Sequence, residues 1–153
     1  MIKHIWSLLC RNSVIDSDTN NLSIHDILEQ LNIDAVLKEG QSDTAQQSVN
    51  IPLEFEVVSF WLKTNGEEKP RGELNIEAIS PEGKVLTHFL RDIEIPKEVQ
   101  RLRTRLKITG LVVEGSGTYI FRISLREKSE DAFANVAEIP LQVNINRKVK
   151  SSA

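Results

Sequence analysis

The sequence predicts an all-β fold, a two-sheet antiparallel sandwich of about eight strands. Three observations predict it. Apolar and polar residues alternate along most of the chain, as they do in strands with one buried face. Residues that favour turns interrupt this alternation at short intervals. The chain of 153 residues is long enough for one domain with its own core and too short for two.

The first two strands are expected to form a hairpin. Residues 3–10, KHIWSLLC, are followed at 16–21 by DSDTNN, whose side chains bond their own backbone in turns. A second strand is predicted at Leu22 to Asp26. The apolar residues that follow, Leu28 to Ile33, fit either a helix face or a strand with a bulge, and both interpretations stay open. Residues 38–50 are polar and aperiodic, which predicts a surface loop.

The most apolar strand is predicted within residues 51–63. Up to Val57 its odd positions are apolar, whereas from Val58 onward its even positions are. A change of parity without a turn predicts a β-bulge near these two valines, or a strand that passes from one sheet to the other. In this interpretation Trp61 points away from the core.

The remaining strands follow with short turns between them, and Pro81 occupies the second position of one turn. We expect these strands at residues 73–79, 84–95, 101–108, 119–126 and 134–146. Pro140 cannot donate to a ladder, which predicts an edge strand or a bulge. The expected aromatic core is Phe55, Phe60, Phe89, Tyr119 and Phe121. Residues 1–147 are predicted to form the single domain, followed by a basic disordered tail at 148–153.

The segment 101–108, RLRTRLKI, places a cation at every second position, between apolar residues that are expected to be buried: Leu102, Leu106 and Ile108. Alternate residues of a strand share one face and lie about 6.6 Å apart, so the cations form a row. Two cations of a later strand have the same parity and would widen the row if the strands were neighbours. The candidate contacts for a polyanion or an acidic partner are Arg101, Arg103, Arg105, Lys107, Arg122 and Arg126.

The alternative is a solvated face. Repulsion within such a row costs only on the order of 1 kcal/mol in water. Acids on neighbouring strands would offset this cost through cross-strand pairs, and the candidates are Glu54, Glu73, Glu77 and Asp92. The two interpretations differ in whether acids or further arginines lie beside the row.

Trp61 and Lys63 form a second candidate contact. A tryptophan on the outer side of a strand, next to a lysine, could anchor a partner protein. If the bulge exists, Trp61 could instead cover the second sheet, and both interpretations stay open.

Composition gives little indication of chemistry. The net charge of −3 provides no global attraction to polyanions. Cys10 is the only cysteine, so no disulfide and no thiolate metal site can form within the chain, which fits a reducing compartment. The three histidines lack metal-ligand spacing. We therefore expect no enzyme activity, no metal and no cofactor. No apolar run is long enough to cross a bilayer, so we expect a cytoplasmic protein.

Five segments in order, PLEFEVVSFWLK, ISPEGKVL, RLRTRLKITGL, GSGTYIFRISLRE and VAEIPLQVNI, resemble a family of uncharacterised bacterial proteins. The resemblance covers most of the chain and extends to TNNLSIHDILEQL near its start. It implies a compact β-sandwich, immunoglobulin-like or C2-like, and transfers no functional residue.

These observations lead to two hypotheses about function. The first is a non-catalytic protein-interaction or assembly module, which binds another protein or a second copy of itself. The alternative is a C2-like sandwich that binds phospholipid or nucleic acid through the basic strand at 101–107.

Overall fold

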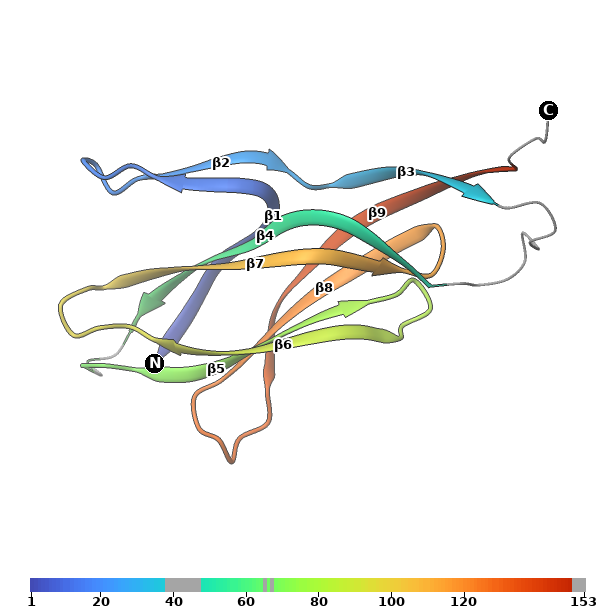
Figure 1. The fold of residues 1–153 in the computed structure, drawn as a ribbon. Helices are drawn as coiled ribbons and strands as arrows, with labels where there is room; N and C mark the ends of the chain where they lie inside the picture. Colours follow the sequence, from blue (N-terminus) through green and yellow to red (C-terminus); the bar gives the residue numbers. More distant parts are fainter. Residues whose placement is uncertain (38–47, 65, 67, 150–153) are drawn as a thin grey trace.

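The computed structural model describes residues 1–37, 48–64, 66 and 68–149, and this part of the chain forms nine strands in two sheets (Figure 1). The all-β prediction is confirmed, with one strand more than expected. The strands are β1 (Ile2–Ile15), β2 (Leu22–Ile27), β3 (Gln30–Leu37), β4 (Val49–Lys63), β5 (Arg71–Ile79), β6 (Val85–Glu94), β7 (Arg101–Val113), β8 (Gly117–Arg126) and β9 (Ala134–Val149).

Two predicted segments fall partly outside the described residues. Residues 38–47 of the expected loop are not described, and its last two residues begin β4. Residues 150–153 of the expected tail are also not described, whereas its first two residues still belong to β9.

Sheet A has the strand order β2-β1-β4-β7 and is antiparallel, whereas sheet B has the order β3-β9-β8-β5-β6 and is mixed. The prediction of purely antiparallel sheets is wrong for sheet B, because β3 pairs with β9 in parallel. The reason lies in the connection after β2. There the chain crosses from sheet A to the edge of sheet B through the buried Leu28, whose N–H donates to the carbonyl oxygen of Leu9 at 2.8 Å.

The segment from Leu28 to Ile33 is therefore a connection followed by a strand, and the helix interpretation is wrong. Pro140 lies in β9, which is an inner strand of sheet B. The structure nevertheless gives this proline a free side, because β3 pairs with β9 only from Gln142 onward. On its other side Pro140 is the register partner of Ile120.

The two sheets share one core. The rings of Phe55 in sheet A and Phe121 in sheet B meet edge to face, with centroids 5.7 Å apart. Tyr119 is also fully buried, and its hydroxyl donates to the carbonyl oxygen of Gly115 at 2.7 Å. Phe89 packs partly buried against the core. Phe60 does not belong to this core, because it occupies an even position of β4 and the odd positions face the core.

The odd positions of β4 stay inward along the strand, so the predicted change of parity near Val57 and Val58 is wrong. Trp61 belongs to the core and is 0% exposed. The register shifts lie elsewhere, between Ile51 and Glu54 in the pairing of β4 with β7, and in β1. Apolar residues occupy the even positions because the outer face of β4 is covered too.

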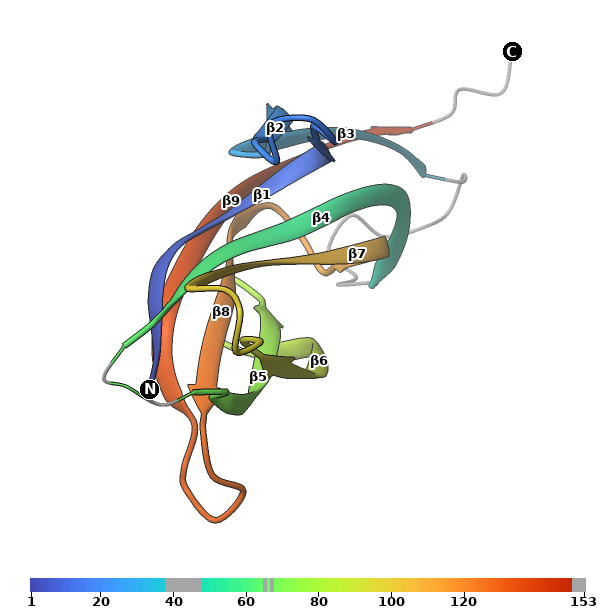
Figure 2. The ribbon, with the colours of Figure 1, turned by 90° about the vertical axis from the view of Figure 1, so that its left-hand side faces the viewer.

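The cover is the β1–β2 hairpin, which the sequence predicted. The first part of β1 pairs with β4, and the part from Cys10 to Ile15 pairs with β2. At the tip, Asp16 Oδ1 accepts the backbone N–H groups of Asp18 and Thr19 at 2.8 and 2.9 Å. Figure 2 shows the hairpin above β4 and β7, with β5 and β6 on the opposite side. The β4 and β7 strands of sheet A therefore lie between the hairpin and sheet B.

Candidate binding surface on the outer face of sheet A

The outer face of sheet A presents a regular grid of side chains from β1, β4 and β7. Residues that are register partners in antiparallel strands share a face and stand side by side. Three rows cross the strands in this way: Lys3–Leu62–Arg101, Trp6–Phe60–Arg103 and Leu8–Val58–Arg105. The arginines of β7 thus border an apolar column of β4. The register partners of these three arginines on β4 are apolar, and neither an acid nor a further arginine takes that place.

A β-bulge in β1 places Trp6 on this face. The register with β4 shifts between His4, the partner of Trp61, and Trp6, the partner of Phe60. The His4 ring lies edge-on against Trp61, with centroids 5.1 Å apart. Trp6 stacks on Phe60, with centroids 5.7 Å apart and 12° between the rings. The sequence analysis missed Trp6, because nothing in HIWSLL marks the position of the bulge.

Two arginines of β7 hold the hairpin to this face. Arg105 donates from Nη1 to the carbonyl oxygen and to Oγ of Ser13, at 3.2 and 3.3 Å. Ser13 Oγ donates to Glu56 Oε2 at 2.5 Å. Arg103 donates from Nη2 to the carbonyl oxygen and to Oδ1 of Asn20, at 2.9 and 3.0 Å. We refer to Ser13, Asn20, Arg103 and Arg105 as the hairpin latch.

The latch closes the space between the hairpin and the sheet at one end. Val58, although it points away from the core, is 0% exposed. Cys10 and Ser13 are buried on the same side. The arginines can hold the hairpin while they border an apolar column, because the aliphatic stem of an arginine packs on apolar surface and its charged end reaches a polar partner.

Toward the hairpin tip the space remains open, next to the latch residues Asn20 and Arg103, which line it. A pocket of about 400 Å³ lies between the hairpin tip, the outer face and the connection from β6 to β7. Ile15, Phe60 and Val99 supply apolar surface, and Arg101 and Arg103 supply positive charge. This volume falls in the range of small ligand sites. The combination suits a group that carries both an apolar part and a negative charge.

Arg101 is the predicted cation that remains available. Its side chain is exposed, and within the described part of the chain it has no hydrogen-bond or ion-pair partner. Lys107, at the other end of the row, lies 3.9 Å from Glu54 Oε2, and both side chains are exposed. The row is therefore divided into a latch in the middle, one acid-paired lysine and one free arginine.

Arg122 and Arg126 do not widen the row, because they lie on β8 in sheet B. Arg122 lies 4.0 Å from a carboxylate oxygen of Glu77 on β5 and 3.4 Å from one of Glu138 on β9. Arg126 donates to Glu73 Oε1 at 2.8 Å, and its guanidinium lies 4.3 Å from the centre of the Phe133 ring. Glu73 and Glu77, which the solvated-face interpretation expected beside the row, pair with these two arginines of sheet B instead.

Trp61 and Lys63 are both engaged within the fold. The indole Nε1 of Trp61 donates to Thr104 Oγ1 at 2.9 Å inside the core, so the predicted outward orientation is wrong. Lys63 Nζ donates to three backbone carbonyl oxygens, those of Glu68, Pro96 and Lys97, at 3.0, 3.1 and 3.2 Å. Lys63 thereby ties the β4–β5 connection to the β6–β7 connection. The aromatic surface on the outer face is supplied instead by their neighbours Trp6 and Phe60, which are both half-buried.

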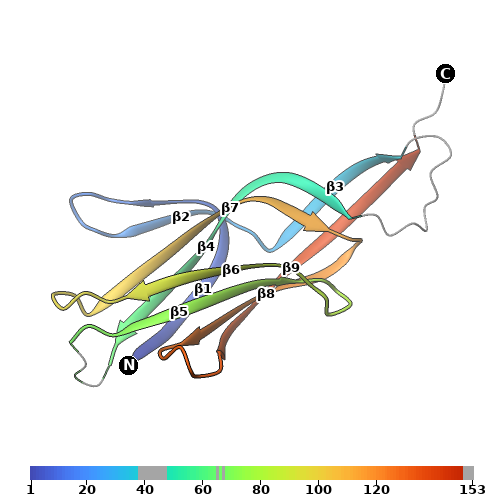
Figure 3. The same cartoon turned by 60° about the horizontal axis from the view of Figure 1, so that its bottom comes forward.

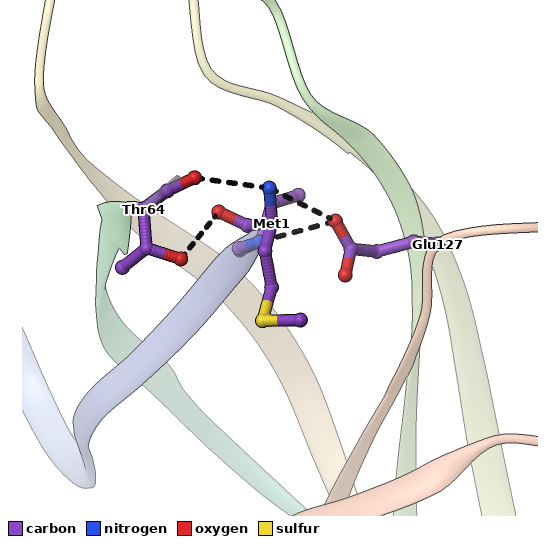
Figure 4. Close-up of polar contacts among 4 residues, drawn as sticks. Met1, Thr64 and Glu127 are labelled. Carbon is purple, nitrogen blue, oxygen red and sulfur yellow. Dashed lines mark hydrogen bonds and ion pairs between the residues drawn. The ribbon is translucent and has the colours of Figure 1, made fainter. Parts of the chain in front are cut away.

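A cluster of polar contacts holds the lower end of this face (Figure 4). The backbone N–H of Ile2 donates to Glu127 Oε1 at 3.1 Å. Thr64 donates from its backbone N–H and its hydroxyl to the carbonyl oxygen of Met1, at 2.9 and 3.3 Å. The start of β1, the end of β4 and the residue after β8 are thus joined, which fixes the two sheets next to the row that contains Lys3.

Two side chains of β1 that could take part in proton or nucleophile chemistry have shifted pKa values. Burial raises the pKa of the Cys10 thiol to about 11, and the charge of Glu56 acts in the same direction. Burial lowers the pKa of His4 from its ordinary value. Among the described residues, no three His, Cys, Asp or Glu side chains gather in a group that could hold a metal ion. The described chain also forms no apolar helix long enough to cross a lipid bilayer.

No protein-family model matches the chain, and no curated protein sequence is similar to it. What can be said of its function therefore depends on the geometry of its own residues.

Proposed function

We propose that the protein is a non-catalytic protein-interaction module, which binds its partner through the outer face of sheet A. The observation that carries the proposal is the stacked pair of Trp6 and Phe60, which shares the outer face with Lys3 of β1 and with the cations of β7. Aromatic residues and arginine are enriched at the centres of protein interfaces, where they contribute most of the binding free energy.

The chemistry of this face favours a partner segment with an apolar residue next to an acidic one. Phe60 and Val99 line the pocket and could contact the apolar side chain of the partner segment. Arg101 stands at the same pocket with its guanidinium exposed. A guanidinium binds a carboxylate through two parallel hydrogen bonds, so it selects an acid in a defined orientation.

Binding to phospholipid or nucleic acid is the second candidate function. It is favoured by the presence of cations beside stacked aromatic rings, an arrangement that single-stranded nucleic acids also use. Its support is weaker, because five of the six cations predicted for it have partners within the chain. Among the described residues, only Arg101 of the six has no side-chain partner.

The test compares wild type with Arg101→Glu, and uses Arg91→Glu on β6 as the matched control. Arg91 is exposed in the other sheet, and among the described residues its side chain bonds only the carbonyl oxygen of its neighbour Leu90. Selection from a displayed library of random peptides should enrich sequences that combine an acidic and an apolar residue. Arg101→Glu should weaken binding of the enriched peptides about tenfold or more, the effect of losing one charged pair. Arg91→Glu should bind as wild type does.

The proposal fails if no peptide is enriched, or if both variants bind equally well. Single-stranded DNA and phosphatidylserine vesicles, tested at low salt with the same variants, address the second candidate. Salt-sensitive binding to either probe that Arg101→Glu abolishes would favour the polyanion function over the protein partner.

The same proposal includes an immunoglobulin-like or C2-like sandwich in the bacterial cytoplasm. The shared core of the two sheets supports a sandwich, while the parallel pair of β3 and β9 is a departure from the purely antiparallel form. The single cysteine supports a reducing compartment.

A further inference from the structure

Two segments far apart in the sequence carry the same pattern and lie side by side. Residues 30–34 read QLNID, and residues 142–146 read QVNIN. In the parallel pairing of β3 with β9 each residue stands beside its counterpart in the pattern, for example Asn32 beside Asn144. Beyond Val143, β9 has no pairing with β8, so the two segments continue as a two-stranded ribbon (Figure 3).

Side-chain amides connect the two strands on the polar side of this ribbon. Asn32 Oδ1 accepts hydrogen bonds from Gln30 Nε2 at 3.2 Å and from Asn144 Nδ2 at 3.1 Å. Asp34 Oδ1 accepts from Asn146 Nδ2 at 3.4 Å. On the opposite side Leu31 and Ile33 pack against the core. From Gln30 to Asp34, one side of β3 is therefore polar and the other apolar, and another strand could continue both.

The outer backbone edge of β3 pairs with no strand in the described part of the chain. The other three sheet edges carry protective features that natural proteins use against unwanted pairing. β7 has its row of cations, β6 has Arg91 and Asp92, and β2 is only six residues long. Asp34 is the single charge of β3, which has neither lysine nor proline.

We propose that β3 pairs with β3 of a second copy of this chain, antiparallel, about a twofold axis that passes beside Asn32. A twofold axis perpendicular to a sheet makes two equivalent edge strands antiparallel and keeps each face on its own side. Asn32 then stands opposite Asn32 of the second copy, and Gln30 stands opposite Asp34 of the second copy.

The edge is complementary to itself in this register. Gln30 supplies amide donors to the carboxylate of Asp34 across the axis, and the exchange occurs twice. On the other face Leu31 comes opposite Ile33, so apolar side chains also meet apolar side chains. The pairing closes after two copies, because each copy contributes its one free β3 edge. Two five-stranded sheets become one continuous sheet.

Disulfide trapping tests the register. In Asn32→Cys the two thiols would face each other, with Cα atoms about 4.5–5.5 Å apart, which suits a disulfide. In Gln30→Cys the two thiols would lie four residues apart along the strands, about 13 Å, which is too far. The native Cys10 is buried and does not compete. Mild oxidation should give a covalent dimer of Asn32→Cys and leave Gln30→Cys monomeric. A covalent dimer of both variants, or of neither, would overturn the proposal.

Charge substitution tests the pairing without a covalent bond. Gln30→Lys would face Asp34 of the second copy and strengthen the dimer, whereas Gln30→Asp would repel it. Since the contact occurs twice, each variant should change the dissociation constant by about two- to thirtyfold, in opposite directions. His25→Lys and His25→Asp, at an exposed site on β2, are the matched controls for net charge. Sedimentation equilibrium that shows a monomeric wild type at every concentration, or a shift in the same direction for both Gln30 variants, would contradict the proposal.

Discussion

Arg103 of β7 and Asn20 at the tip of the β1–β2 hairpin are 83 positions apart in the sequence and are joined by two hydrogen bonds from one guanidinium nitrogen. This contact determines how a strand with a cation at every second position is used. Cations that look equivalent in the sequence differ in role, because the hairpin reaches only some of them. The middle of the row fastens the fold, and its first residue faces the pocket.

Replacing Arg103 by methionine should therefore lower stability more than the same change at Arg101. Arg103→Met loses both bonds to Asn20, and we expect a loss of about 1 kcal/mol in the free energy of unfolding because the contact is exposed. Arg101→Met should stay within about 0.5 kcal/mol of wild type. Urea unfolding of both variants measures the difference. Equal losses would show that the latch contributes nothing.

Ser13→Ala should be more costly, because Ser13 links two charged groups. Its hydroxyl donates to Glu56 and accepts from Arg105 in a buried position. Its removal leaves Glu56 and Arg105 partly without partners, and we expect a loss of about 1–3 kcal/mol. Ser23→Ala, at an exposed position of β2, is the control and should be nearly neutral. Thermal unfolding monitored by circular dichroism would reveal the difference, and similar melting temperatures would refute this role of Ser13.

Lys63→Met should destabilise the protein although it replaces a charged residue by an apolar one. The ammonium group satisfies three carbonyl oxygens, which lose their donor in the variant. The expected loss in the free energy of unfolding is about 1–3 kcal/mol. Lys97→Met removes an exposed ion pair with Glu68 and should cost less than about 1 kcal/mol. Chemical denaturation that ranks the two variants in the reverse order would contradict this account.

The stability of the protein should fall as the pH decreases through the range in which His4 is protonated. Burial lowers the pKa of His4 below its ordinary value of 6.5, so the folded state binds fewer protons than the unfolded chain does. The stabilisation that neutral His4 gives the folded state is complete above pH 6.5. It is lost as the pH falls through the pKa that His4 has in the folded state. His4→Gln should reduce this slope in the free energy of unfolding. An unchanged slope in His4→Gln would exclude His4 as its source.

The thiol of Cys10 should react slowly in the folded protein. With its pKa raised to about 11, very little thiolate is present near pH 8. Alkylation by iodoacetamide at that pH should be roughly a hundredfold slower than in urea, because thiolate is the reactive form. Mass spectrometry of timed samples gives both rates. Comparable rates in the two conditions would mean that the strand around Cys10 opens readily.

Alternation along the chain predicted the β-strands and the β1–β2 hairpin, because a strand with one buried face leaves this pattern in its sequence. The same rule failed in β4. Val58 and Phe60 are apolar because a hairpin covers them, and an alternation rule interprets apolar residues on both parities as a bulge. The true bulge near Ile5 left no pattern, since no turn-favouring residue or break in the sequence marks it between His4 and Trp6.

The candidate surface could be predicted only in part. Arg101 and Arg103 were found from their charge, and both line the pocket. Their division into free and fastened residues depends on Asn20, a contact between distant segments that local sequence does not encode. The sequence analysis did not find the relationship of β3 and β9, because the similarity of two five-residue segments does not indicate that the segments are neighbours.

The position of β4 has a consequence for the order in which the molecule opens. β4 has a strand on each side, the core on one face and the hairpin on the other, so its amide hydrogens are shielded from every direction. Hydrogen exchange in its central residues, from Phe55 to Trp61, should require global unfolding, whereas β2 and β3 at the sheet edges should exchange by local opening. The arginines of β7 slow amide exchange in β2 indirectly, because they hold the hairpin in place. Breaking the latch should therefore speed exchange in β2 long before it affects exchange in β4.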